Sequence, residues 1–323
     1  MIKISVVVPI YNAENFIVHL LDKIYKQTLT DFELICVNDG SSDNTEEILE
    51  NYASKHNNMR VINQTNGGIG KATNTGINHA TGKYLLQLDH DDSLNTDEAF
   101  EILYKKAEEY DLEILSFNFS TEAHVNKLRQ PIEKLMTGKE YLLGGFHPAL
   151  WSKFCRIDFL NKINFRLNEH LRFVDTEAYP RLMIHAQRVM HIDDVLYFFR
   201  TATNKESVSD NIMNTKSAIA FYETAATYNQ LIDEVEEIEL IKALKTNQMA
   251  NAIGCARILG SINSDESREI YTSLLALNWS PFELLFIKNE YKFFYYKYIK
   301  KDPKILHPLN YIIRRIRKLQ PWG

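Results

Sequence analysis

The sequence is poor in cysteine, and the three that it has, Cys36, Cys155 and Cys255, lie far apart in the chain. They form no CxxC pair, and their odd number and wide spacing do not fit a framework of paired cysteines. A small secreted domain stapled by disulfides is therefore excluded, and the pattern is typical of a reducing compartment.

Long apolar runs are also absent. No uninterrupted apolar stretch reaches the roughly 20 residues that a membrane-spanning helix needs. The opening run from Ile4 to Tyr11 is short, contains Pro9 and is followed by no small-residue cleavage site, so it does not fit a secretory signal. We therefore expect a cytoplasmic protein.

A strong overall charge is missing as well. The 37 basic and 42 acidic residues give a net charge of −5, which offers no reason to expect nucleic acid as a partner. The charge is uneven, because between Lys288 and Lys318 ten lysines and arginines outnumber two acidic residues, a local charge of +8. With 45% hydrophobic and 24% charged residues, the composition is that of a folded globular protein.

What the first 120 residues do contain is an alternation of two periodicities. Short, nearly continuous apolar runs are typical of strands buried on both faces, and the segments between them have helical spacing. This order predicts a parallel sheet with helices on both faces. The expected strands are 3–9, 32–38, 59–63 and 84–88, and the expected helices are 13–27, 43–55, 69–80 and 96–110.

The pattern beyond residue 120 is less regular. Residues 113–120 fit a further strand, and residues 190–200 fit either a strand or a hairpin with a turn near Asp193 and Asp194. Helical spacing returns over 212–273, so we place a domain boundary near residue 211.

Polar residues follow each expected strand, at the edge of the sheet where ligands bind. Turn-forming residues account for any one of these loops. They account poorly for the three acids within Asp89–Asp92, because charges that close repel unless something neutralises them. The polar loop residues are Tyr11, Asn12 and Glu14 after the first strand, then 38–42, 66–68 and 89–92 after the others.

If the fourth strand continues to its end, Asp89 and Asp91 point to the same side, because alternate residues of a strand do so. Two carboxylates together suit a hard divalent cation such as Mn²⁺ or Mg²⁺, which completes its shell with water and substrate phosphates. The alternative is a turn whose acids cap the helix expected near Thr96, a role that suits Asp92.

Four segments, taken in order, resemble one family. Over residues 3–205 the chain resembles the inverting family 2 glycosyltransferases of the GT-A fold. The specificity lies in the ordered set, because PxYN or DxD alone is a weak signal. The segments are VVVPIYNAENF (6–16), VNDGSSDNT (37–45), NGGIGKATNTGINHATGKYLLQLDHDD (66–92) and VDTEAYPRL (174–182).

The resemblance implies an α/β architecture. A GT-A, Rossmann-like nucleotide-sugar-binding domain with a mostly parallel central sheet would occupy residues 1–210. Residues 1–118 would form its nucleotide-binding half and 119–210 its acceptor half. Residues 211–323 would form a helical C-terminal region with a basic aromatic tail.

The resemblance also implies a donor site. Asp91 would be the principal ligand of Mn²⁺ or Mg²⁺, with Asp89 near the ribose or the metal, and Asp39 would hydrogen-bond the base, usually uracil. Where many relatives have an arginine this chain has Thr73, and Lys71 can replace its charge but not its bidentate fork. The other nucleotide-binding residues would be Pro9, Tyr11, Glu14, Asn66, Gly67, Lys71, Asn74 and Arg200, the last of which could equally be a structural, salt-bridged arginine.

The catalytic base of the family is usually the aspartate of a Glu-Asp pair that opens a helix. Here the matching pair is Val174-Asp175, so Asp175 is the expected base, and Glu177 is the second choice. Asp175 could instead cap that helix, with Glu177 and Arg181 as an i,i+4 surface pair.

The acceptor side is expected around Trp151 and Lys153. An indole packs well against the apolar face of a pyranose, although Trp151 could equally belong to the core.

These features predict an enzyme that transfers one sugar from a nucleotide-diphosphate donor, a UDP-hexose or UDP-N-acetylhexosamine, in bacterial glycan synthesis. The QxxRW motif and membrane helices of processive relatives are missing. Acceptors would be glycan, lipid-linked or protein-linked, and the alternative is a non-catalytic scaffold that keeps the fold. The tail over 282–323 would contact either anionic lipid on the inner face of the cell membrane or a second copy of the chain.

Overall fold

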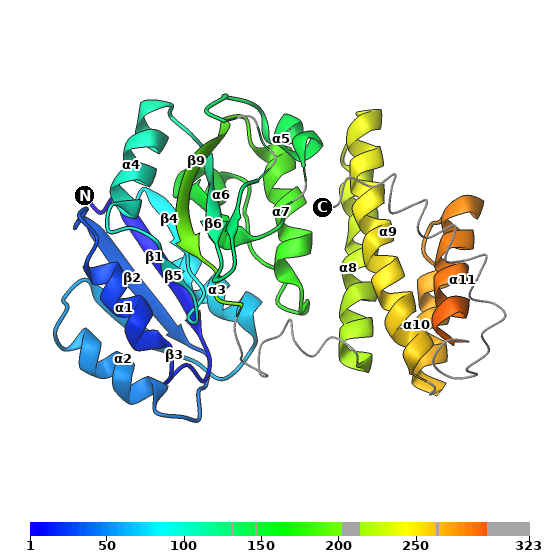
Figure 1. Ribbon diagram of the computed structural model, residues 1–323, viewed down its shortest axis with the longest axis horizontal. Helices are drawn as coiled ribbons and strands as arrows, with labels where there is room; N and C mark the ends of the chain where they lie inside the picture. The colour runs from blue at the N-terminus through cyan, green and yellow to red at the C-terminus, as the bar shows by residue number, and fades with distance from the viewer. Residues whose placement is uncertain (129, 131, 146, 202–213, 263–264, 296–323) are drawn as a thin grey trace. The chain divides into compact units, whose positions relative to one another are not determined.

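A computed structural model describes residues 1–295 apart from 129, 131, 146, 202–213 and 263–264 (Figure 1). The chain forms two compact units, Met1–Thr203 and Asn204–Gly323. The boundary expected near residue 211 falls on the stretch 202–213, outside the described residues.

The first four long strands are parallel, as their apolar character predicts. Three of them are buried at every position, so apolar side chains are needed on both faces, while β3 lies at the edge and is half exposed. These strands are β1 (Ile4–Ile10), β2 (Phe32–Asn38), β3 (Met59–Asn63) and β4 (Tyr84–Gln87), joined by α1 (Ile17–Tyr25), α2 (Thr45–Ala53) and α3 (Ile69–His79), and α4 (Ala99–Glu109) follows.

The complete sheet has nine strands in the order β3-β2-β1-β4-β8-β6-β9-β5, with β7 paired to β6. The α/β class is confirmed. The parallel arrangement holds over β3-β2-β1-β4 and between β6 and β9, whereas β8 runs antiparallel between β4 and β6. The later strands are β5 (Ser93–Leu94), β6 (Ile114–Ser120), β7 (Val125–Asn126), β8 (Lys153–Arg156) and β9 (Val189–Phe198).

Two of these strands bear on the expected organisation. β9 is one continuous strand, so the hairpin alternative near Asp193 and Asp194 does not occur. β6 spans residues 118 and 119, so one sheet runs through both of the halves expected for the first domain.

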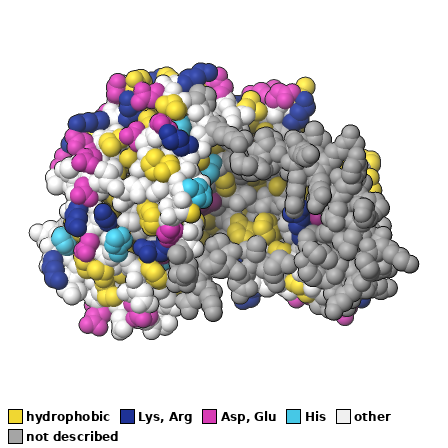
Figure 2. Space-filling view, viewed as in Figure 1, with side chains coloured by type: hydrophobic (Ala, Val, Ile, Leu, Met, Phe, Trp, Pro, Cys, Tyr) yellow, Lys and Arg dark blue, Asp and Glu magenta, His cyan; other side chains and the backbone are white. Residues whose placement is uncertain are grey.

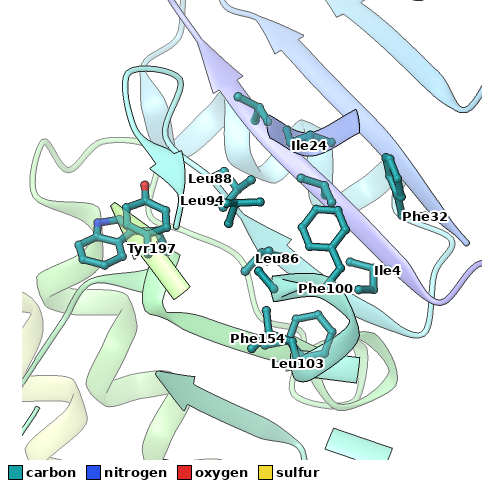
Figure 3. Packing of buried hydrophobic residues seen from close by; sticks show 14 of the residues in the cluster. Ile4, Ile24, Phe32, Leu86, Leu88, Leu94, Phe100, Leu103, Phe154 and Tyr197 are labelled. Atoms are coloured by element: carbon teal, nitrogen blue, oxygen red, sulfur yellow. The ribbon is translucent and has the colours of Figure 1, made fainter. Parts of the chain in front are cut away.

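Helices α1 and α4 cover one face of the sheet and form the main core with it. The buried residues of α1 recur at i, i+3, i+4 and i+7, which places them on one face. Figure 3 shows Phe100 of α4 near Ile4 and Leu103 near Phe154. The opposite face is covered at β1 by α3.

The rest of the first unit contains α5 (Gly138–Gly144), the 3-10 turn η1 (Leu150–Ser152), α6 (Ile157–Lys162) and α7 (Val174–His185). Figure 2 shows basic and acidic side chains interspersed on the visible face of this unit.

The second unit is helical in its described part, as expected. Its core contains Ala252, Cys255 and Ala256 of α9 with Trp279, whose indole nitrogen donates to the main-chain oxygen of Leu274. No helix in the described ranges combines the length and apolar character needed to cross a bilayer. The helices are α8 (Thr215–Asp233), α9 (Ile238–Ser261), α10 (Asp265–Leu275) and α11 (Pro281–Tyr295).

Candidate active site

The site lies where the strand order reverses. The chain passes from β1 to β2 on one side and returns to β4 on the other, so the carboxyl ends of β1, β2 and β4 share one edge. In open parallel sheets, ligands bind in the crevice at such a point.

Hydrogen bonds join the loops after β1 and β2. Asn12 has a left-handed backbone (φ 49°), and its side-chain oxygen accepts from Ser42 N at 2.9 Å. The carboxylate of Glu14 accepts from the main-chain and side-chain nitrogens of Asn44, at 3.1 and 2.8 Å. Glu14 therefore joins the two loops, while Tyr11 is 47% exposed at this edge.

Asp39 organises the loop after β3. Its carboxylate is only 3% exposed and accepts from Gly67 N at 2.9 Å, Gly68 N at 2.8 Å and Gln64 Nε2 at 2.7 Å. Gly68 has φ +86°, a conformation that favours glycine. Asn66, in the same loop, is exposed.

Lys71 and Asn74, the two α3 residues expected near the donor, differ in exposure and in their contacts. Lys71 is exposed, and its side chain lies against Gly67, where an added Cβ would be 2.2 Å from Lys71 Cδ. Asn74 is buried and bonded to the loop before α7, with its oxygen accepting from Leu167 N at 2.8 Å and its nitrogen donating to Leu167 O at 2.9 Å. Thr73 is 1% exposed and lines an internal cavity of about 20 Å³ beside Lys153.

The acidic segment after β4 is a turn, so the condition under which strand geometry would point Asp89 and Asp91 to the same side is not met. β4 ends at Gln87, and Asp92 N donates to Asp89 O at 3.2 Å. Asp92 does not cap a helix either. Its two oxygens accept from Tyr197 OH at 2.6 Å and Arg200 N at 2.8 Å, which fastens the turn to β9.

Arg200 supports the same turn, because its Nε donates to the main-chain oxygen of Asp91 at 2.8 Å. Among the described residues, none donates a hydrogen bond to the carboxylate of Asp91. Burial, together with the charges of Asp175 and Asp91, raises the pKa of Asp89 to about 7. Acids from two distant parts of the chain therefore meet here, in an arrangement that a cation would stabilise.

Asp175 lies in the first turn of α7, but it does not cap the helix. The cap position is Phe173, and the carboxylate of Asp175 accepts from Leu150 N at 3.2 Å. Burial raises the pKa of Asp175 to about 6. Glu177 is buried, and its carboxylate forms an ion pair with Arg181 Nε at 2.6 Å. Glu177 and Arg181 are therefore not the exposed surface pair that the sequence allowed.

The residues expected to contact the acceptor are buried. Trp151 is 7% exposed, and Tyr197 stacks on it at 4.3 Å between ring centroids, with Phe199 stacked at 5.8 Å. This matches the core alternative for Trp151. Lys153 is 2% exposed and lies beneath the surface.

Sequence patterns missed two supports of this site. Tyr197 holds Asp92 and also accepts from Asp89 N at 3.3 Å, and Leu150 holds Asp175 through its main chain. No local pattern marks either residue, because both contacts join segments far apart in sequence.

Comparison with known proteins identifies the class of this enzyme. The family model described as Glycosyl transferase family 2 matches residues 5–165. The uncharacterized glycosyltransferase EpsJ of Bacillus subtilis is 31% identical over 239 residues, which cover 68% of this chain and 69% of EpsJ. The chain therefore belongs to the family 2 glycosyltransferases, enzymes that use nucleotide-sugar donors.

Solved structures agree on the fold. S. aureus TarS 1–349, in complex with UDP-GlcNAc, matches with a TM-score of 0.67 at 21% identity, over 91% of this chain and 89% of that chain. The mannosyltransferase PcManGT from Pyrobaculum calidifontis, in complex with GDP-Man and Mn²⁺, matches with a TM-score of 0.57 at 16% identity, over 90% of this chain and 87% of that chain. The predicted GT-A fold is confirmed.

Proposed function

We propose that the protein is an inverting, metal-dependent glycosyltransferase that moves one sugar from a UDP-linked donor to a glycan, lipid-linked or protein-linked acceptor. The observation that carries this proposal is the approach of Asp175, at the start of α7, to Asp89, which in turn lies close to Asp91 in the turn after β4. The site would thus combine a place for a metal-bound diphosphate with a base for the acceptor.

The donor would lie across the carboxyl ends of β1 and β2. The exposed ring of Tyr11 would stack on the base, and the Oδ2 of Asp39 accepts one bond from Gly68 N, which leaves capacity for an imino N–H of uracil. The TarS complex with UDP-GlcNAc supports a UDP-hexose or UDP-N-acetylhexosamine, and the PcManGT complex makes GDP-mannose the alternative to test.

Asp91 and Asp89 would hold Mn²⁺ or Mg²⁺. No group of three or more His, Cys, Asp or Glu side chains within the described ranges is arranged to hold a metal. Two carboxylates still fit these cations, which take oxygen ligands and keep places for water and phosphate. Such a cation would neutralise the departing diphosphate.

Asp175 would act on the acceptor. As the acceptor oxygen bonds to the anomeric carbon, the bond to the diphosphate breaks on the opposite side, and the hydroxyl proton passes to the Asp175 carboxylate. An alcohol is a much weaker acid than a carboxylic acid, so the proton must move as the new bond forms, and the placement of Asp175 matters more than its basicity.

The test is a screen of UDP- and GDP-sugars for release of the nucleoside diphosphate, with Mn²⁺, Mg²⁺ or EDTA and no added acceptor. Release should require metal, and Asp91→Ala should abolish it. Water takes the place of the acceptor in this assay and must lose its proton in the same way, so Asp175→Asn should lower turnover by about 10²- to 10⁴-fold, while the Kd for UDP measured by calorimetry changes little.

Asp97→Asn is the matched control, because Asp97 is an exposed acid outside the turn and should leave turnover unchanged. Metal-independent release, or full turnover by Asp175→Asn, would refute the proposal. UDP binding without turnover of any donor would favour the scaffold alternative.

A further inference from the structure

A row of buried polar side chains crosses three neighbouring strands. In the sheet register Ser116 of β6 lies beside Lys153 of β8 and beside His191 of β9, so all three side chains point to the same face. Lys153 is 2% exposed and the other two are fully buried. Burying polar groups is unfavourable unless they are hydrogen-bonded, so the burial of each of these three side chains needs a physical explanation.

Two members of the row hold the sheet to a helix. The hydroxyl of Ser116 bonds to the Tyr141 hydroxyl of α5 at 2.5 Å and to His191 Nδ1 at 3.0 Å. Burial lowers the pKa of His191 to about 4, so it is neutral at physiological pH. This end of the row is structural.

Lys153 has different partners. Its Nζ donates to Ser152 Oγ at 2.6 Å and to Ala149 O at 3.3 Å, both in or next to η1. The first residue of this turn is Leu150, whose main-chain N–H donates to the Asp175 carboxylate. Lys153 therefore supports the turn that holds Asp175.

Lys153 also contacts the helix that carries Asp175. Its Nζ lies 5.3 Å from the centroid of the Tyr179 ring, one turn further along α7. Burial lowers the pKa of Lys153 to about 7, and the charge of Asp175 opposes that shift. The amine of Lys153 thus affects Asp175 in three ways. It bonds to the turn that holds the carboxylate, it contacts the helix that carries it, and its charge lowers the pKa of Asp175.

We propose that Lys153 is a positioning residue that fixes the Ala149–Ser152 turn and so holds the carboxylate of Asp175 for proton transfer. This inference rests on the role of Asp175 in the proposed function. It replaces the direct acceptor contact that the sequence suggested for Lys153.

The test uses the full chain with UDP-GlcNAc and Mn²⁺ as the probe. Lys153→Met should lower kcat for release of UDP by roughly 10- to 100-fold, while the Kd for UDP stays within about twofold, since the donor pocket is untouched. If Lys153 acts through Asp175, the Lys153→Met/Asp175→Asn double variant should be no slower than Asp175→Asn alone. Hydrogen exchange gives a readout independent of turnover, because the Leu150 amide should exchange faster in Lys153→Met.

His191→Gln is the matched control, since it alters an equally buried member of the row that does not bond to the turn, and it should keep kcat. Should Lys153→Met fail to fold, Ser152→Ala removes one Nζ acceptor and should cause a smaller loss of the same kind. Unchanged kcat and unchanged Leu150 exchange in the variants, or losses that multiply in the double variant, would overturn the inference. Full activity in Asp175→Asn would instead show that the proposed function itself has failed.

Discussion

At the scale of single residues, the acids after β4 divide by the partners that they have. One oxygen of Asp92 accepts from Tyr197 of β9, and the other accepts from the main chain of Arg200, just after the end of that strand. Among the described residues, Asp89 accepts a long bond from Gln87 Nε2, at 3.4 Å, and Asp91 accepts none at its carboxylate. Asp92 thus holds the turn in place, and Asp89 and Asp91 are the other acids that this turn carries.

This division predicts the effect of Tyr197→Phe. The change leaves an oxygen of Asp92 buried without its donor, so the free energy of unfolding should fall by about 1–3 kcal/mol. Affinity for Mn²⁺ in the presence of UDP should fall with it, because the turn is less firmly held. Urea unfolding and calorimetric titration measure the two effects.

Tyr104→Phe is the control, since its hydroxyl bonds to Glu108, away from the turn, in a partly exposed position. Equal losses of stability in both variants would contradict the special role of Tyr197.

The sequence predicts where this site lies better than it predicts the role of each residue in it. Acids following a buried strand mark the sheet edge, and Asp175 follows from its position in a family motif. The partners of Asp92 and Asp175 come from β9 and η1, and no local spacing encodes contacts over such distances. Trp151 shows the same limit, because its stacking against Tyr197 and Phe199 is a tertiary contact that local sequence does not encode.

At the scale of elements, α3 determines where α7 begins. Asn74 of α3 makes paired hydrogen bonds with the main chain of Leu167 and a third with Glu169. Near the start of α3, a Cβ at Gly70 would lie 3.2 Å from Asn168 O and from Val174 Cγ1. The helix after the donor loop therefore braces the segment that leads to Asp175.

Asn74→Ala tests this bracing. It leaves the Leu167 amide and carbonyl without partners, so the free energy of unfolding should fall by roughly 2–4 kcal/mol. Turnover should fall as well, with little change in UDP affinity, because the base moves and the nucleotide pocket does not. Asn78→Ala, an exposed site on the same helix that bonds to Arg166, should cost about 1 kcal/mol or less. Comparable effects from the two variants would argue against a bracing role for Asn74.

Periodicity predicts strands that are buried throughout, such as β1 and β2, and helices that bury one face, such as α1 and α4. It does not predict β8, a four-residue strand inserted antiparallel between β4 and β6. Strand order here results from packing between distant segments, which also decides that β9 is one strand and not a hairpin.

At the scale of the whole molecule, the family match covers residues 5–165, which lie entirely in the first unit. The chemistry of transfer is therefore assigned to that unit. The helices of the second unit have a core of their own, formed by α8, α9, α10 and α11.

Helix α11 carries large apolar side chains that the described part of the chain leaves exposed. Phe282 is 65% exposed and Leu285 55% exposed, and Phe286 packs edge-on against Phe282 at 4.7 Å. The excess of basic residues begins at Lys288 in the same helix and continues in sequence to Lys318, although residues 296–323 lie outside the described part. Apolar side chains beside cationic sequence suit the surface of an anionic bilayer.

We therefore expect the full chain to sediment with phosphatidylglycerol vesicles and not with phosphatidylcholine vesicles, and salt should weaken the binding. Phe282→Ser/Leu285→Ser should lower the partition coefficient about 10-fold or more, because each buried apolar side chain contributes about 1.5–3 kcal/mol. Ile238→Ser is the control, since Ile238 is just as exposed, at 68%, but lies at the start of α9 without the basic run. Binding that survives the double substitution would remove the membrane role of this face, and a shift from dimer to monomer in the same variant would assign the face to a second copy of the chain.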